Sequence, residues 1–212
     1  SIHELCKEIV ETCRICRNWT RAGPKAVVSV RLPSHFNEEI EFDILFYKDR
    51  VIGHCIDRLL RWTMARTMPD RTPSSHIAFF MHWIEVFGPM TVLISDQQGA
   101  MVSDESGTWC SRLGIHRRLK PKGAKAWICE RHHEILRRSL HRVEDQMKEE
   151  GLNIPFDVVL AEVAFGKNAL LSVHGCSPYV GLFGQVPRLL PDLHGATMEA
   201  LNNDNRRLEP DP

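Results

Sequence analysis

The chain has 212 residues, of which 43% are hydrophobic and 25% are charged, an ordinary composition for a globular protein. This length fits one substantial domain with appendages, or two small domains. The 27 basic and 27 acidic residues cancel, so the overall charge gives no evidence for a polyanionic partner, and nucleic-acid contacts would need local basic patches. No signal peptide or long uncharged apolar run is visible, so a membrane or secreted protein has no support.

Seven cysteines, odd in number and unevenly spaced, indicate reduced thiols rather than a disulfide framework. We therefore expect an intracellular protein. Because the chain begins at Ser1 without an initiator methionine, we also expect a fragment or a processed piece of a polyprotein.

Residues 1–18 have helical spacing of apolar side chains, and the Gly23-Pro24 pair ends this segment before an extended linker. Hydrophobic periodicity and turn residues then predict an alternation of strands and helices. The expected strands are 40–47, 51–57, 61–67, 90–95 and 115–119, and the expected helices are 73–87, 103–113, 126–150 and 156–171, followed by a Pro/Gly-rich tail. This order indicates an α/β fold with a mixed sheet flanked by helices.

Three acidic residues stand beside apolar runs, where an unpaired carboxylate is costly unless it binds a cation. Asp43 lies within EFDILFY at 41–47, Asp96 ends MTVLISD at 90–96, and Glu130 lies in WICERHHE at 127–134. If two strands and a helix bring these carboxylates together, they form a hard-oxygen site suited to Mg²⁺ or Mn²⁺.

These segments resemble the Asp-Asp-Glu catalytic core of retroviral and LTR-retrotransposon integrases. Phe-Asp on a first strand, Ser-Asp-x-x-Gly after a later strand and Glu-Arg-His on a helix carry the resemblance, with 52 residues between Asp43 and Asp96 and 33 between Asp96 and Glu130. The second interval is slightly shorter than is usual, and Gln97-Gln98-Gly99 has one residue more than the common Asp-x-Gly pattern. The downstream Ser-Pro-Tyr…Phe-Gly segment is also similar.

The resemblance implies a ribonuclease-H-like fold and divides the chain into four parts. Residues 1–22 would be the end of a zinc-binding domain, 23–38 a linker, 39–172 the catalytic core and 173–212 a C-terminal extension. It also implies that Asp43 binds both metal ions, while Asp96 and Glu130 bind one each.

Two other acidic residues compete for these positions. Asp57 ends the second expected strand and is an alternative to Asp43, and Glu134 lies one helical turn after Glu130. The Glu-Arg-His context favours Glu130.

Cys13 and Cys16 have the spacing of half a zinc site, and a complete site needs four ligands. In the family two histidines precede such a pair at a distance, whereas His3 and Cys6 stand too close to it. The two thiols are therefore either part of an incomplete Zn²⁺ site or neighbours on a helix.

Basic residues near the triad are candidates for phosphate contacts, although charged runs are often only solvated faces. The candidates are Arg117, Arg118, Lys120, Lys122, Lys125, Arg131 and Arg137. His132 and His133 would contact phosphate or lie on the helix surface.

The resemblance implies divalent-metal-dependent phosphoryl transfer on DNA: trimming of an element's 3′ end, then strand transfer into a target, by a homo-oligomer that acts in the nucleus. Two alternatives remain open. One is a catalytically inactive or domesticated DNA-binding module, and the other is a different ribonuclease-H-like nuclease.

Overall fold

A computed structural model describes residues 4, 8, 12, 32–121, 127–173 and 175–188, with Trp127 described by its backbone only. Contacts divide the chain into the units Ser1–Leu32 and Pro33–Pro212. The first unit contains few described residues, so the expected zinc-binding segment with Cys13 and Cys16 lies outside them. The predicted domain boundaries stay a prediction.

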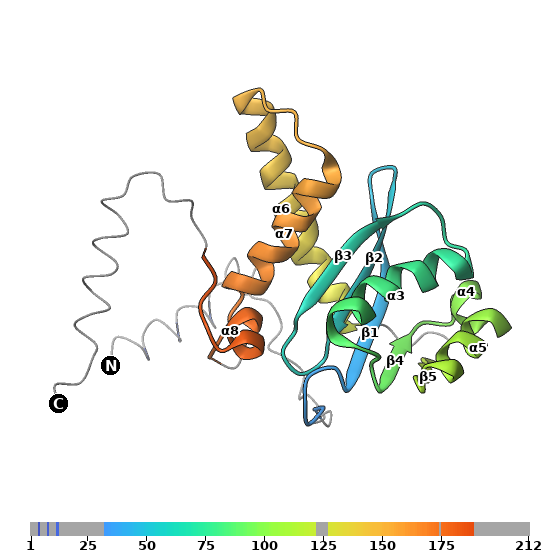
Figure 1. The fold of residues 1–212 in the computed structure, drawn as a ribbon. Helices are drawn as coiled ribbons and strands as arrows, with labels where there is room; N and C mark the ends of the chain where they lie inside the picture. The colour runs from blue at the N-terminus through green and yellow to red at the C-terminus, as the bar shows by residue number, and fades with distance from the viewer. Residues whose placement is uncertain are drawn as a thin grey trace. The chain divides into compact units, whose positions relative to one another are not determined.

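The second unit is built on a mixed five-stranded sheet with the strand order β3-β2-β1-β4-β5 (Figure 1). The antiparallel strands β1 (Glu39–Tyr47), β2 (Arg50–Asp57) and β3 (Thr63–Met68) form a meander. The strands β4 (Val92–Ser95) and β5 (His116–Leu119) add to β1 in parallel. This arrangement confirms the expected mixed sheet.

Helices cover both faces of the sheet (Figure 1). They are α3 (Pro73–Phe87), α4 (Gly99–Val102), α5 (Asp104–Arg112), α6 (Trp127–Glu150), α7 (Phe156–Leu170) and α8 (Pro178–Phe183). The nine expected elements are all present, with bounds shifted by at most two residues. The sequence analysis missed α4, which is a single turn, and α8, whose Pro- and Gly-containing segment was predicted to be a tail.

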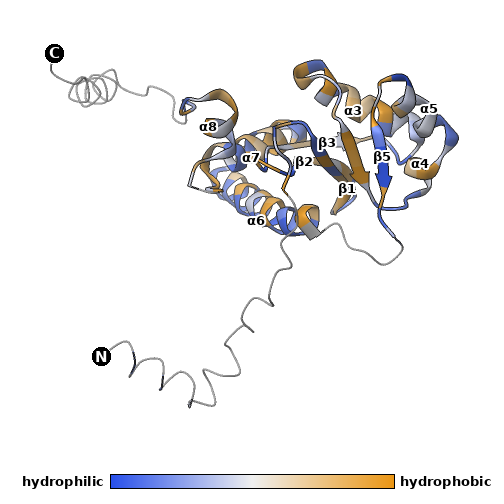
Figure 2. Ribbon diagram, turned by 90° about the horizontal axis from the view of Figure 1, so that it is seen from below, coloured by the Kyte–Doolittle hydropathy of each residue, from blue (hydrophilic) through white to orange (hydrophobic). Residues whose placement is uncertain are grey.

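Two hydrophobic clusters lie on opposite faces of β1 because side chains alternate along a strand. Phe42 and Ile44 pack with α3 and α5, whereas Leu45 and Tyr47 pack with α6 and α7. Because helices cover both faces of β1, its sequence is nearly continuously apolar. Figure 2 shows the difference in hydropathy between β1 and the hydrophilic β5.

Asn37 connects the start of β1 to the end of α3. Its Nδ2 donates to the carbonyls of Phe87, Gly88 and Pro89 at 3.1–3.3 Å, and its Oδ1 accepts from Trp83 Nε1 at 2.9 Å. Its backbone has φ 67°, a left-handed conformation that asparagine tolerates better than most residues. One side chain therefore satisfies the carbonyls at a helix end and the buried indole.

We expect Asn37→Ala to lower the free energy of unfolding by about 3 kcal/mol, because it leaves buried polar groups unpaired and strains the backbone. Asn37→Gly removes the same hydrogen bonds without the strain, so it should lose about 1 kcal/mol less. Urea denaturation of the three proteins measures both differences. Variants as stable as the wild type would contradict this role.

Candidate active site

Asp43 and Asp96 are brought together by the parallel pairing of β1 with β4. The register pairs Phe42 with Ser95, so the two aspartates occupy the next position along each chain. Neighbouring strands lie about 4.8 Å apart, so the two carboxylates are adjacent, Asp43 within the central strand β1 and Asp96 just after the end of β4. Two segments more than fifty residues apart in sequence thus contribute adjacent acidic groups.

Glu130 approaches the same site from the first turn of α6. Cys129 holds this turn on β1, since its backbone N–H and its Sγ both lie 3.4 Å from acceptors of Glu41, the side-chain Oε1 and the carbonyl oxygen. Cys129 is fully buried, whereas Glu130 is exposed on the next position of the helix.

The electrostatics of Asp43 show that the three carboxylates interact. The pKa of Asp43 is raised to about 6, mainly by burial and also by the charges of Asp96 and Glu130, while the backbone N–H of Ile44 and the Lys120 ammonium oppose the shift. The structure therefore brings the three predicted residues within electrostatic reach of one another. Like charges that repel in this way are stabilised by a bound cation.

The oxygen atoms of the two aspartates differ in their partners. Asp43 Oδ1 accepts from the N–H of Ile44 at 2.8 Å and from Gln98 Nε2 at 3.1 Å. Asp96 Oδ1 is buried with no hydrogen-bond partner, which is costly for a carboxylate unless a cation is bound.

Within the described ranges, no three His, Cys, Asp or Glu side chains meet at metal-ligand distances. The carboxylate donor set and the unpartnered Asp96 oxygen nevertheless fit a hard divalent cation. Asp43, Asp96 and Glu130 stay the candidate ligands that the sequence predicts, and they would have to close further around an ion.

Asp57, the alternative to Asp43, has a structural environment. Its Oδ2 accepts from the backbone N–H of Asn37 at 3.0 Å, and its Oδ1 accepts from those of Leu59 and Leu60 at 3.0 and 2.6 Å. The side chain is fully buried; Oδ1 fixes the turn after β2, and Oδ2 ties that turn to Asn37, ahead of β1.

Glu134, the alternative to Glu130, is exposed and pairs with Arg138 across one turn of α6 at 2.5 Å. Such exposed pairs contribute little to stability. No hydrogen bond or ion pair joins Glu134 to Asp43 or Asp96 in the described part of the chain.

Gln98 is a site residue that the sequence analysis treated only as an irregularity of the loop. The residue beyond the usual Asp-x-Gly pattern allows a tight turn, in which the Gln98 N–H donates to the Asp96 carbonyl at 2.8 Å, and α4 begins at Gly99. This turn aims the Gln98 amide at Asp43.

The expectation that His132 and His133 contact phosphate or lie on the helix surface was wrong. They are only 7% and 4% exposed, because they share the buried side of α6 with Cys129 and Leu136. Burial lowers the pKa of His132 to about 3 and that of His133 to about 4, so both are neutral at pH 7. The 3.9 Å contact between His133 Nδ1 and Asp43 Oδ2 is therefore not an ion pair at that pH.

Several predicted basic residues are engaged in structural contacts. Arg117 donates to the carbonyls of Met101 and Ser103, Arg118 pairs with Glu39 at 2.8 Å, and Lys120 pairs with Glu41 at 2.8 Å. Lys122 and Lys125 lie outside the described residues.

Arg131 and Arg137 differ from these basic residues. Both are exposed on α6, and neither forms an ion pair within the described part of the chain. They therefore have positive charge available for a phosphate near Glu130.

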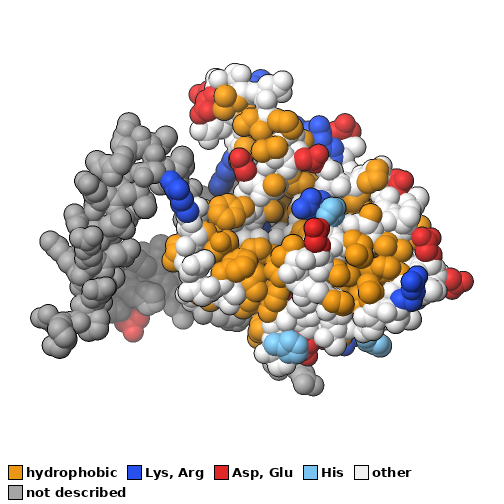
Figure 3. All heavy atoms as spheres, in the orientation of Figure 1, with side chains coloured by type: hydrophobic (Ala, Val, Ile, Leu, Met, Phe, Trp, Pro, Cys, Tyr) orange, Lys and Arg blue, Asp and Glu red, His pale blue; other side chains and the backbone are white. Residues whose placement is uncertain are grey.

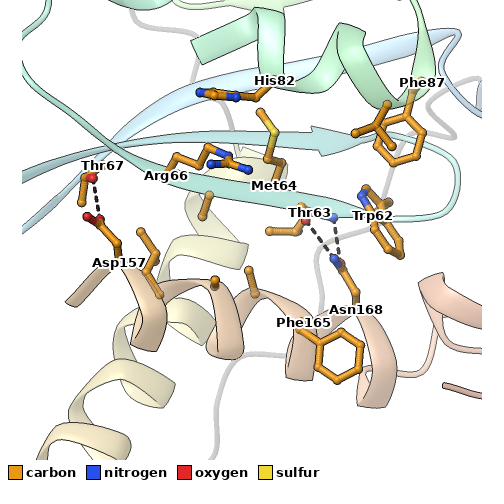
Figure 4. Close-up of a pocket in the computed structure, with 15 residues that line it drawn as sticks. Trp62, Thr63, Met64, Arg66, Thr67, His82, Phe87, Asp157, Phe165 and Asn168 are labelled. Carbon is orange, nitrogen blue, oxygen red and sulfur yellow. Dashed lines mark hydrogen bonds between the residues drawn. The ribbon is translucent and has the colours of Figure 1, made fainter. Parts of the chain in front are cut away.

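A hollow of about 500 Å³ lies away from the triad, between β3, α3 and α7 (Figure 4). At one end of the edge strand β3, Thr67 donates to Asp157 of α7 at 2.6 Å. At the other end, Asn168 of α7 accepts from the N–H of Thr63 and donates to its carbonyl, so both ends of β3 are hydrogen-bonded to α7. Between these bonds the lining is largely apolar, and hydrophobic side chains are numerous on the face drawn in Figure 3. We call this hollow the β3 groove.

No family model and no curated protein sequence matches the chain. Solved structures do match it. A chain of the simian T-cell lymphotropic virus intasome, solved by cryo-EM in complex with PP2A regulatory subunit B56 gamma, gives a TM-score of 0.65 at 22% identity over 87% of this chain and 67% of its own length.

Two catalytic core domains match this chain over nearly their whole length. The HTLV-2 integrase catalytic core in complex with magnesium (dimeric form) has a TM-score of 0.60 and 18% identity over 68% of this chain and 94% of its own. The BIV integrase core has a TM-score of 0.59 and 14% identity over 80% and 99%. The chain therefore has the ribonuclease-H-like fold of a retroviral integrase catalytic core. None of its described helices is long and apolar enough to cross a membrane.

The raised pKa of Asp43 makes a prediction about stability. The folded chain holds this proton more tightly than the unfolded chain, so the contribution is present below pH 4 and is lost as the pH rises through about 6. Asp43→Asn should therefore gain stability relative to the wild type between pH 4 and 7, by about 3 kcal/mol at most. Excess Mg²⁺ should narrow the gap, because the cation offsets the repulsion only when the carboxylate is present.

Denaturation of both proteins at several pH values, with and without Mg²⁺, measures this difference. A difference independent of pH would contradict the assignment of Asp43 to the repelling cluster.

Proposed function

We propose that the chain is part of a retroelement integrase that catalyses divalent-metal-dependent DNA 3′-end processing and strand transfer. The observation that supports the proposal is the adjacency of Asp43 and Asp96 on paired strands, with Glu130 within electrostatic reach of Asp43 and an unpartnered oxygen on Asp96. The integrase-core fold supports it. The HTLV-2 core was solved with magnesium, which is the type of cation that these carboxylates favour.

The chain's own residues have separable roles in this reaction. Asp43 and Asp96 would hold the cations from the sheet, and Glu130 would hold them from the helix. When bound, Mg²⁺ or Mn²⁺ supplies activation of the attacking water or 3′-hydroxyl and stabilises charge on the leaving oxygen. Gln98 would keep Asp43 oriented through its 3.1 Å hydrogen bond.

Because the proton on Asp43 must be lost before a cation binds, binding should strengthen as the pH rises through about 6.

Arg131 and Arg137 are the proposed phosphate contacts of the described part of the chain. Arg137 lies seven residues after Glu130, about 10 Å along the same exposed side of α6. Lys122 and Lys125 stay sequence predictions, as does Zn²⁺ binding by Cys13 and Cys16.

We further propose that the working form contains more than one copy of the chain and acts in the nucleus on an element's DNA ends and target DNA. The HTLV-2 core was solved in dimeric and trimeric forms. Here the β3 groove, beside an edge strand and the exposed Val86 and Phe165, is the surface that we assign to the second copy.

We expect Asp96→Asn to abolish resolution of a branched DNA substrate in Mn²⁺, with a loss of at least about 100-fold, since several kcal/mol of charge stabilisation depend on the cations. The thermal midpoint should stay equal or rise, because removing one carboxylate relieves repulsion. Asp145→Asn, an exposed aspartate further along α6, is the matched control and should keep full activity.

Activity of Asp96→Asn equal to the wild type would refute the site. Two other outcomes favour the alternative functions: binding of DNA without metal-dependent chemistry indicates an inactive module, and cleavage of an RNA–DNA hybrid without strand joining indicates another nuclease.

The assignment of Arg137 to a phosphate predicts a salt effect. Arg137→Gln should reduce the slope of log affinity for DNA against log salt by about 0.9, the value expected for one lost phosphate contact. Lys148→Gln serves as the control, because this exposed residue is 18 positions beyond Glu130, about 27 Å along α6. Fluorescence anisotropy titrations at several salt concentrations measure both slopes, and equal slopes for the two variants would contradict the assignment.

A further inference from the structure

Phe46 is an exposed aromatic residue on the strand that carries Asp43. It is 53% exposed, whereas its neighbours Leu45 and Tyr47 are buried. Three positions separate Phe46 from Asp43, about 10 Å along an extended strand. Because side chains alternate along a strand, this large apolar ring is presented to solvent on the face of β1 that carries Phe42 and Ile44, whereas Asp43 points to the face covered by α6.

Arg71 stands over this ring, with its guanidinium carbon 5.7 Å from the ring centroid. It is exposed and forms no ion pair with any described residue. Its acidic neighbour Asp70 forms no ion pair with it; the Asp70 carboxylate instead accepts from the N–H and Oγ1 of Thr72 and from Ser75 Oγ at 2.5–2.9 Å.

This cluster also fixes the loop that begins α3, since the Thr72 side chain is the N-cap of that helix. The loop therefore carries Arg71 on an ordered turn and leaves its charge free.

A hollow of about 520 Å³ connects this pair to the candidate active site. Phe46 and Arg71 line it together with Asp43, Ile44, Gln98, Gly99 and Ala100. Its volume is within the range of small-molecule sites. The same hollow thus offers an aromatic face, a free guanidinium, and an edge formed by Asp43 and the amide that orients it.

We propose that this hollow is a nucleobase subsite, in which the base of an unpaired nucleotide next to the reacting phosphate stacks on Phe46 and Arg71 contacts its phosphate or stacks on its other face. Aromatic rings bind single-stranded nucleic acid by stacking with little sequence preference, and arginine adds a charge and a planar surface. The inference rests on the proposed function for the position of the phosphate. It adds that the chain distinguishes unpaired from paired ends, because a base in a duplex is stacked on its neighbours and has no free face.

The test uses DNA that carries 2-aminopurine in an unpaired 3′ tail, and the same strand fully paired as the control substrate. Binding is measured by fluorescence with the full chain in the Asp96→Asn background, so that no turnover is required. Wild-type Phe46 should quench the tail fluorescence and favour tailed over paired DNA.

Phe46→Ala should lose the quenching and weaken binding of tailed DNA by roughly ten- to a hundredfold, while binding of paired DNA changes little. Phe46→Trp should restore both signals, whereas Phe46→Leu, apolar but not aromatic, should not. Phe183→Ala, which removes a 48% exposed aromatic residue of α8 that lines neither this hollow nor the β3 groove, is the matched control and should behave as the wild type.

Equal preference for tailed DNA in Phe46→Ala and in wild type, with an unchanged thermal midpoint, would overturn the proposal. So would an equal loss of affinity for tailed and paired DNA, which indicates a general contact. If the chain shows base stacking but no metal-dependent chemistry, the subsite stands and the proposed function fails. If it shows chemistry but no stacking, the opposite holds.

Discussion

Repulsion between the carboxylates of Asp43, within β1, and Asp96, just after β4, is the constraint on which the rest of the site depends. Parallel pairing places Asp43 beside Asp96, and α6 adds Glu130 to the same site. In a folded chain this arrangement is unfavourable without a cation. Burial is the main cause of the raised pKa of Asp43, and the charges of Asp96 and Glu130 add to it. A cluster that lowers stability without a ligand and gains it with one is typical of a functional site.

The surrounding structure limits the repulsion without removing it. At the start of β1, Glu39 and Glu41 are paired with Arg58, Arg118 and Lys120, so two further acidic groups of the same strand are neutralised locally. These pairs explain why basic residues close to the triad are not free for DNA.

The buried histidines of α6 are neutral and add no positive charge. The triad thus keeps its negative potential for a cation, and the free charge for phosphate lies on Arg131 and Arg137 and, on the other side of Asp43, on Arg71.

The hollow beside Asp43 and the β3 groove differ in the chemistry of their lining residues. The hollow beside Asp43 combines a carboxylate, an amide, an aromatic ring and a free guanidinium, which suits a nucleotide. The β3 groove is mostly apolar between the bonds that α7 makes to the two ends of the edge strand, which suits a protein surface. The β3 groove lies beside the edge strand β3, whereas Asp43 lies on the central strand β1, so the two hollows occupy separate parts of the same sheet.

Local pattern in the sequence was enough to predict most of the elements, because alternation and helical periodicity report burial directly. It missed α4 and α8, whose short length and glycine content give no periodic signal. It also identified the three acidic residues, since a carboxylate next to an apolar strand is conspicuous without any knowledge of its neighbours.

The partners of each polar side chain were decided by tertiary structure. Asp57 and Asp43 look equivalent in sequence, yet three backbone N–H groups occupy Asp57, whereas Asp43 faces two other carboxylates. The burial of His132 and His133 likewise depends on tertiary structure, because the contact of Cys129 with Glu41 holds this side of α6 on β1. The spacing from Cys129 to Leu136 shows only that both histidines share one side of the helix with these two residues. Residue types and their order along the chain therefore determined which groups are available, and long-range strand and helix pairing determined which of them meet, because hydrogen bonds and charge interactions act over a few ångströms that sequence separation does not record.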